Sequence, residues 1–223
     1  MGKLPKINII YEDNHLLVVE KPINIPVCED ESKDIDLLTI LKQYIKEKYK
    51  KPGNVYLGLV HRLDRPVGGI MVFAKTSKAA SRLSNQVREK KLNKTYYAVV
   101  ENKLKEKDTL KDYLVKNEKT NITTVTTKDK GKEAILNYEI IKTIDNLNLV
   151  RINLITGRSH QIRVQFSSRN NPLYGDQKYN KNAVSNTNIA LFAKKLEFTH
   201  PTTKEQLSFE IELPKRYPFN LFE

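Results

Sequence analysis

The sequence predicts an α+β fold in which a largely antiparallel, mixed sheet carries helices packed on it. Segments with strand patterns outnumber those with helical patterns, and many neighbouring strands are joined by short turns, which favours antiparallel pairing. The chain has 223 residues, of which 39% are hydrophobic. That length suits one large domain, or one core with two lobes.

The first part of the chain is expected to form a hairpin, two helices and two further strands. In chain order these are strands at 7–11 and 16–20, a helix at 34–49, strands at 57–60 and 69–74, and a helix from residue 77 onward. The turn Asp13-Asn14 joins the hairpin. The first helix has apolar residues at helical spacing, and Pro52-Gly53 ends it. Ser77 can cap the second helix.

The rest of the chain is mostly strand in its pattern. Strands are expected at 96–101, 109–115, 122–127, 133–143, 147–155, 189–198 and 207–213, and a short helix starts at 156–157 and runs through residue 166. Charged turns separate most of these strands. In the last strand Leu207, Phe209 and Ile211 alternate with polar residues, so one face of that strand is expected to be buried.

The charge of the chain indicates a polyanionic partner. Lysine and arginine total 39 against 26 acidic residues, a net charge of +13. Such an excess is typical of proteins that bind nucleic acid, although a background bias toward lysine would also produce it. No apolar run is long enough to cross a membrane, and the N-terminus lacks the apolar core of a secretory signal. The single cysteine, Cys28, excludes an internal disulfide and fits a cytoplasmic protein.

One candidate site is the segment His61-Arg62-Leu63-Asp64-Arg65, which lies between two apolar strands. Its polar residues are expected at a strand end, where catalytic loops usually lie. Arg62 and Arg65 flank Asp64 and would keep its carboxylate ionised, and such a carboxylate can act as a nucleophile. The alternative is a surface ion pair in a charged turn.

A second candidate is the segment 156–163, with the sequence Thr-Gly-Arg-Ser-His-Gln-Ile-Arg. A strand ends there and a short helix begins, so free backbone N–H groups favour an anion. Arg158, His160 and Arg163 add donors for phosphate or carboxylate. A capped helix with a solvated basic face explains the same residues.

The third candidate is Lys94-Thr95-Tyr96-Tyr97, which follows the basic run at 88–91. An aromatic ring beside cations can stack on a base while the charges hold phosphates. Tyr96 and Tyr97 point to opposite faces of a strand, so one is expected in the core and the other can line a site. Two tyrosines with purely structural roles are the alternative.

Taken together, these segments resemble the motifs of the RluA-type pseudouridine synthases. Six motifs occur in the order of that family: 11–22, 61–65 followed by Gly69 and the strand after it, 94–96, 156–163, 171–179 and 198–202. The similarity extends from about Ile7 to Pro214. It implies the pseudouridine synthase fold with a central basic cleft, in a single catalytic domain over residues 1–223 without a separate N-terminal RNA-binding domain.

The resemblance also implies a role for each site residue. Asp64 would be catalytic and Arg163 would pair with it, while Tyr96 would stack on the target base and Ile162 would pack against its ring. Arg62 would fill the place that the flipped nucleotide leaves. Further RNA phosphate contacts are expected from Arg65, Lys94, Arg158 and His160.

The implied substrate is a uridine in ribosomal or transfer RNA, and the implied enzyme is a monomer that needs no metal or cofactor. The sequence has no glycine-rich dinucleotide or phosphate-binding motif, and its histidines lack metal-ligand spacing. Two alternatives remain open: a non-catalytic RNA-binding protein and a hydrolase that uses Asp64.

Some residues depart from the family pattern or are expected to be structural. Asn24 and Asn170 stand where the family usually has glycine, and asparagine tolerates a positive φ. Gln165 stands where histidine is common, and Gly68 where serine is common, so the fine substrate preference is open. A hydrogen-bonding role is expected for His61 and a turn position for His200, and Cys28 has no expected role.

Overall fold

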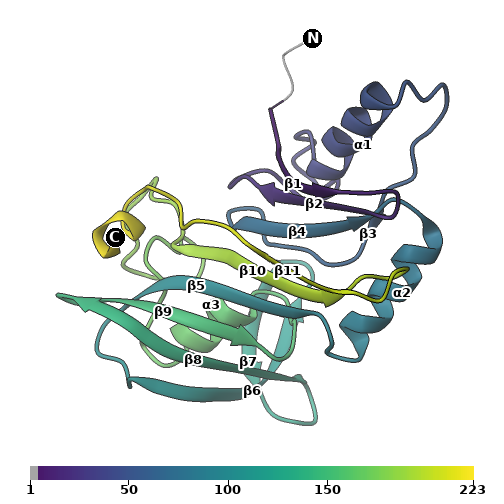
Figure 1. Cartoon of the computed structure of the whole chain (residues 1–223). Helices are drawn as coiled ribbons and strands as arrows, with labels where there is room; N and C mark the ends of the chain where they lie inside the picture. Colours follow the sequence, from purple (N-terminus) through teal and green to yellow (C-terminus); the bar gives the residue numbers. More distant parts are fainter. Residues whose placement is uncertain (1–4) are drawn as a thin grey trace. The chain divides into compact units, whose positions relative to one another are not determined.

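The computed structural model describes residues 5–223. The described residues do not include Met1–Leu4, which begin the N-terminal segment that lacks the apolar core of a secretory signal. The chain forms two compact units. Unit 1 contains Met1–Leu92 and Lys195–Ile211, and unit 2 contains Asn93–Lys194 and Glu212–Glu223. Both units combine antiparallel strands with helices, which confirms the predicted α+β class (Figure 1).

Unit 1 is an antiparallel sheet with two helices. Its elements are β1 (Asn8–Glu12), β2 (Leu16–Lys21), α1 (Leu37–Lys48), β3 (Gly58–Leu59), β4 (Gly68–Ala74), α2 (Ser77–Arg88), the last residues of β10 (Leu191–Thr199) and β11 (Gln206–Glu210). β2 pairs with both β1 and β4, β3 pairs with β4, and β11 pairs with β10. The predicted N-terminal hairpin is therefore confirmed.

The core of unit 1 lies between this sheet and α2. Strands β2 and β4 are almost wholly buried along their length. Ala79 and Leu83 on α2 pack against them, together with Phe198 from β10. Leu207 and Phe209 of β11 are partly buried against the same cluster, which agrees with the predicted apolar face, although β11 ends at Glu210 and not at residue 213 as predicted. These contacts make β2 and β4 a firm base for the loops at their ends.

Unit 2 is built on a second antiparallel arrangement. Its elements are β5 (Asn93–Glu101), β6 (Lys107–Asn117), β7 (Ile122–Thr126), β8 (Lys132–Ile144), β9 (Leu147–Leu154), α3 (Gln161–Ser167), the first residues of β10 and the 3₁₀ helix η1 (Phe219–Phe222). The strand order is β5-β9-β8-β6-β7. The helix α3 packs near β6 and β7.

Several element boundaries differ from the sequence predictions, because local hydrogen bonds decide them. Asp36 caps α1 by accepting from the Thr39 amide, so that helix begins later than predicted. Thr76, one residue before the predicted Ser77, caps α2. The segment at 156–160 forms a turn before α3, which begins only at Gln161.

Two positions with unusual backbone geometry agree with the sequence. Asn24 has a φ of 64° and Asn170 a φ of 60°. Both residues were expected to replace glycine in left-handed turns, and that prediction is confirmed. In the described part of the chain, the helices are too short or too polar to cross a membrane.

Candidate active site

Asp64 lies in the segment that links β3 to β4 in unit 1. Along this segment burial alternates: Leu63 and Val67 are buried, Arg62 is exposed, and Asp64 is partly exposed. The Val67 amide donates to the Asp64 carbonyl over 2.9 Å and closes a turn. The apolar side chains thus anchor the loop, and Asp64 is the partly exposed residue between them.

A buried lysine fixes this loop through its main chain. Lys21, at the end of β2, is 1% exposed. Its ammonium group donates to the carbonyl oxygens of Pro22 at 2.9 Å, Arg65 at 2.9 Å and Val67 at 2.8 Å. The Asn24 amide donates to the same Arg65 carbonyl. These bonds tie the end of β2 to the residues that follow Asp64.

The charge of Lys21 is coupled to the Asp64 loop. Burial lowers the pKa of Lys21 to about 7, and the nearby charge of Arg65 lowers it too, whereas the charge of Asp64 acts in the opposite direction. The protonated amine has one N–H for each of the three carbonyls, but the neutral amine has one fewer. Sequence reasoning assigned no role to Lys21. The available signal was a charged residue closing an apolar strand.

The two arginines beside Asp64 differ in their surroundings. The Arg65 guanidinium forms ion pairs with Asp34 and Asp30 and donates to the Ser32 hydroxyl over 2.8 Å. A phosphate would compete with these carboxylates for Arg65, and its predicted phosphate contact stays a prediction. Arg62 is exposed, and its predicted place in the RNA stack also stays a prediction.

Two histidines of unit 1, His61 and His200, have structural bonds. Nε2 of the buried His61 accepts from the Val72 amide over 3.2 Å, which agrees with the predicted hydrogen-bonding role. His200 lies in the turn after β10, as predicted. Its Nδ1 accepts from the Thr202 and Thr203 amides, and its Nε2 contacts an Asp13 carboxylate oxygen at 2.8 Å.

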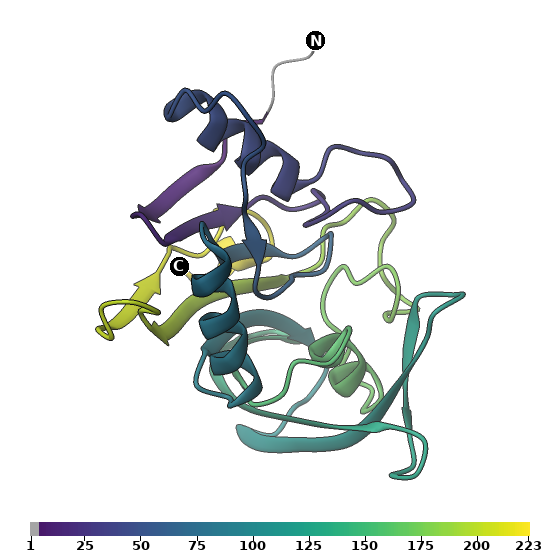
Figure 2. The ribbon, with the colours of Figure 1, turned by 90° about the vertical axis from the view of Figure 1, so that its right-hand side faces the viewer.

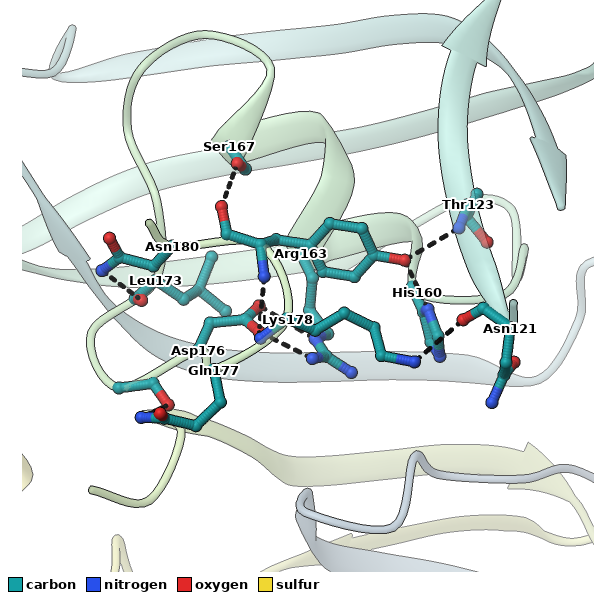
Figure 3. A network of polar contacts seen from close by, with 12 residues as sticks. Asn121, Thr123, His160, Arg163, Ser167, Leu173, Asp176, Gln177, Lys178 and Asn180 are labelled. Atoms are coloured by element: carbon teal, nitrogen blue, oxygen red, sulfur yellow. Dashed lines mark hydrogen bonds and ion pairs between the residues drawn. The ribbon is translucent and has the colours of Figure 1, made fainter. Parts of the chain in front are cut away.

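In unit 2, Arg163 on α3 is held by a buried carboxylate. Nε and Nη2 of Arg163 donate to the two oxygens of Asp176 over 2.9 and 2.6 Å (Figure 3). Arg163 is 5% exposed and Asp176 is 1% exposed. This bidentate contact uses two of the five N–H donors of the guanidinium.

Tyr179 extends this network. Its ring centroid lies 5.0 Å from the Arg163 guanidinium carbon, a cation–π distance. Burial raises the pKa of the phenol, so the hydroxyl keeps its proton at neutral pH. The oxygen accepts from the Thr123 amide and lies 2.6 Å from Nδ1 of His160 (Figure 3). The hydroxyl thus bridges the Thr123 amide and the His160 ring.

Asp176 and Tyr179 lie in one tight loop. The backbone amides of Lys178 and Tyr179 both donate to Oδ1 of Asp176. The preceding residue, Gly175, has a φ of 70°, and a Cβ there would collide with the Asn188 carbonyl oxygen. Sequence reasoning placed this loop in a family motif but gave Asp176 and Tyr179 no role.

The turn before α3 is held by the side chain of Gln161. Its amide oxygen accepts from the Thr156 hydroxyl at 2.8 Å and from the Arg158 amide at 3.0 Å, and its nitrogen donates to the Ile135 carbonyl. Arg158 is exposed, and its Nε donates to the Glu133 carbonyl. The predicted phosphate contacts of Arg158 and His160 stay predictions.

The remaining predicted residues lie on β5 and α3. Tyr96 and Ile162 are each 5% exposed. Tyr97, on the opposite face of β5, is partly exposed, and which of the two tyrosines lines a site stays a prediction. Burial lowers the pKa of Lys94. Its amine nitrogen lies beside Gly157, 3.5 Å from the position that a Cβ on that residue would take.

Gln165, which stands where the family commonly has histidine, is completely buried. Its amide nitrogen donates to an Asp112 carboxylate oxygen and to the Ala134 carbonyl, and its oxygen accepts from Gln161. It is thus part of the framework under α3.

The structure thus places Asp64, Arg62 and Arg65 in one loop of unit 1, and Lys94, Tyr96, Arg158, His160, Ile162 and Arg163 in unit 2. The predicted pairing of Arg163 with Asp64, and the predicted central basic cleft, involve both units and stay predictions. Among residues 5–223, no three metal-ligating side chains gather into a group.

Comparison with known proteins identifies the family. The sequence model described as RNA pseudouridylate synthase matches residues 15–168. Ribosomal large subunit pseudouridine synthase C of Buchnera aphidicola is 34% identical over 221 residues, covering 95% of this chain and 68% of that protein. Ribosomal large subunit pseudouridine synthase D of Zymomonas mobilis is 31% identical over 221 residues, covering 94% of this chain and 70% of that protein.

The fold agrees with this identification. The solved structure of human RNA pseudouridylate synthase domain containing 4 superposes with a TM-score of 0.79 at 21% identity, covering 93% of this chain and 89% of that one. The chain therefore belongs to the RNA pseudouridylate synthase family, in its RluA-type group, and is an RNA pseudouridine synthase that isomerises uridine in RNA.

Proposed function

We propose that the substrate of this enzyme is large-subunit ribosomal RNA and that Asp64 is its catalytic residue. Relatives from two bacteria are named as ribosomal large subunit synthases, and each aligns with more than nine-tenths of this chain. The net charge of +13 supports a substrate rich in phosphate. The enzyme acts as a monomer in the cytoplasm.

The observation that carries the assignment is how Asp64 is presented. The loop around it is fixed by apolar side chains and by Lys21, which binds main-chain carbonyls only. Asp64 is a partly exposed residue of this loop. A carboxylate held on a rigid base suits attack on a nucleoside.

The reaction conserves the atoms of the uridine. The bond between C1′ and N1 breaks, a bond between C1′ and C5 forms, the proton at C5 leaves, and N1 gains a proton. Asp64 either adds to the sugar or base, or removes a proton from the sugar. No oxidant, phosphate donor or second substrate is consumed.

The other site residues bind and orient the nucleotide. Arg163 pairs with Asp64 and keeps its carboxylate charged and oriented, while Tyr96 stacks on the base and Ile162 packs against it. The uridine leaves its stack at a cost of a few kcal/mol, and Arg62 takes its place. Phosphate contacts from Arg65, Lys94, Arg158 and His160 offset part of that cost.

The test combines mapping with a variant. Pseudouridines are mapped by chemical labelling in total RNA from cells with and without the gene. The purified protein is then incubated with unmodified large-subunit RNA that carries tritium at C5 of uridine. We expect tritium release without strand cleavage or free uracil, at positions that lose pseudouridine in the deletion strain.

Asp64→Asn should abolish tritium release while RNA affinity stays within a few-fold. Unchanged turnover in this variant would show that another group is catalytic. Release of uracil would instead support a hydrolase. If the deletion strain loses pseudouridine only from transfer RNA, the ribosomal substrate is wrong but the chemistry stands.

A further inference from the structure

A basic hollow lies in unit 1, away from the Asp64 loop. It has a volume of about 430 Å³ and lies between α2 and the turn that follows β10. Figures 1 and 2 both show α2 beside the end of β10. Four cationic side chains line the hollow, Arg82, Arg88, Lys91 and Lys204, with one carboxylate, Glu89.

The walls of the hollow are fixed to each other by hydrogen bonds. The side-chain amide of Gln86 donates to the Thr199 carbonyl over 2.7 Å and accepts from the Thr199 amide over 2.9 Å. Arg82 and Lys204 both donate to the Pro201 carbonyl, at 2.8 and 3.2 Å. The cations are therefore presented on a preformed surface, which lowers the entropy cost of binding.

The balance of charge in the hollow favours an anion. Four cations against one carboxylate leave a net charge of about three positive units. The carboxylate of Glu89 is already paired with Lys91 at 2.7 Å. Arg88 and Lys91 also stabilise the dipole of α2 at its C-terminal end. That role does not explain Lys204, which comes from the turn between β10 and β11.

The hollow is separated from the Asp64 loop by the length of a strand. Asp64 precedes β4, whereas Thr199 in the wall of the hollow is followed by His200, which contacts Asp13 in the turn beside the other end of β4. The seven residues of β4 span about 23 Å. A ligand in the hollow would not be the reacting nucleotide. An extended polyanion, however, can reach both places at once.

We propose that this hollow is a second RNA-binding site, which holds backbone phosphates of the substrate at a distance from the uridine that is modified. The inference rests on the proposed action on ribosomal RNA. The contacts are made to phosphates, so they add affinity and register but no sequence preference. The site would be used by a long folded RNA and left empty by a short hairpin.

The test measures RNA binding and turnover in the variant Arg88→Gln/Lys91→Gln/Lys204→Gln. The substrates are unmodified large-subunit RNA and a short hairpin around a mapped site. We expect the slope of log affinity against log salt for the long RNA to fall by about two units or more, at roughly 0.7–0.9 per lost phosphate contact. KM for the long RNA should rise about tenfold. We expect kcat, and KM for the hairpin, to stay unchanged.

A matched control uses the C-terminal end of α1. Lys46→Gln/Lys50→Gln/Lys51→Gln removes the same charge from exposed lysines at a helix end, so it reproduces the effects on net charge and helix dipole. It should change the salt slope much less. The single variant Glu89→Gln adds one unit of positive charge to the hollow and should tighten binding of the long RNA about two- to fivefold.

The outcomes separate this inference from the proposed function. If the wild-type protein modifies no ribosomal RNA, the proposed function fails. If the wild type is active but the hollow and control variants lose affinity equally, or Glu89→Gln weakens binding, the second site is wrong. Should the triple variant fail to fold, Glu89→Gln and the single Lys204→Gln variant decide the matter.

Discussion

The loop that carries Asp64 and the helix that carries Arg163 are held in opposite ways. In unit 1 a buried cation, Lys21, binds main-chain carbonyls, so the loop is fixed through its backbone. In unit 2 a buried anion, Asp176, binds the functional side chain itself. The first arrangement fixes the backbone that carries the reactive group, whereas the second fixes the orienting side chain itself. The difference therefore follows from the proposed roles.

Breaking the anchor of Arg163 should have the largest effect. Asp176→Asn leaves a buried guanidinium without its carboxylate, and removal of one partner from such a pair costs about 3–5 kcal/mol. We expect that loss in the free energy of unfolding from urea denaturation, and a fall in kcat of at least tenfold with little change in RNA affinity.

The control for this prediction is the Asp112–Arg169 pair, which is also bidentate but more exposed. Asp112→Asn should cost only about 1 kcal/mol. Equal losses in the two variants would contradict the view that burial makes the Asp176 contact decisive.

Breaking the anchor of the Asp64 loop should have the next largest effect. Lys21→Met fills a similar volume but removes the ammonium donor from the carbonyls of Pro22, Arg65 and Val67, of which only Arg65 keeps the Asn24 amide as a donor, at a cost of about 2–4 kcal/mol. We expect lower urea stability, and turnover reduced more than RNA affinity because Asp64 loses its position. Lys42→Met, on α1, is the control and should be nearly neutral. A stable Lys21→Met enzyme with normal kcat would remove Lys21 from the argument.

The same lysine should give unit 1 a pH dependence. Its pKa is about 7 in the folded protein, below the ordinary value of 10.5. Between these two pKa values the unfolded chain binds more protons than the folded protein, so the free energy of unfolding rises with pH. Below pH 7 the contribution of Lys21 to the free energy of unfolding is at its lowest. The free energy of unfolding of the wild type, minus that of Lys21→Met, should therefore rise by about 1 kcal/mol per unit from pH 7.5 to 8.5. A flat difference would mean that Lys21 keeps an ordinary pKa.

The secondary-structure elements could be predicted from the sequence, but the roles of Lys21 and Asp176, which hold the Asp64 loop and Arg163, could not. Strand patterns, the apolar face of β11 and the left-handed turns at Asn24 and Asn170 follow from local chemistry, and the structure confirms them. Lys21 and Asp176 appear in the sequence as ordinary charged residues. Their roles depend on partners 44 and 13 positions away, and spacing alone does not reveal such tertiary contacts.

The cap positions show the same limit on a smaller scale. Ser77 and Thr76 are both good caps, and only the bond from the Ala79 amide to Thr76 decides between them. The start of α3 was predicted too early because Gln161 satisfies groups in the preceding turn through its side chain. A polar side chain that replaces main-chain hydrogen bonds leaves little trace in the hydrophobic pattern.

The smallest expected effect separates the two contacts that Tyr179 makes. Tyr179→Phe keeps the ring over Arg163 but removes the hydroxyl that contacts His160 and Thr123. We expect a stability loss of about 1 kcal/mol and a change in kcat of no more than a few-fold, because the ion pair with Asp176 is intact. Tyr179→Leu, which also removes the ring, should lower kcat further. If Tyr179→Phe alone reduced kcat as much as Asp176→Asn, the hydroxyl and His160 would position Arg163, and the buried carboxylate would serve stability only.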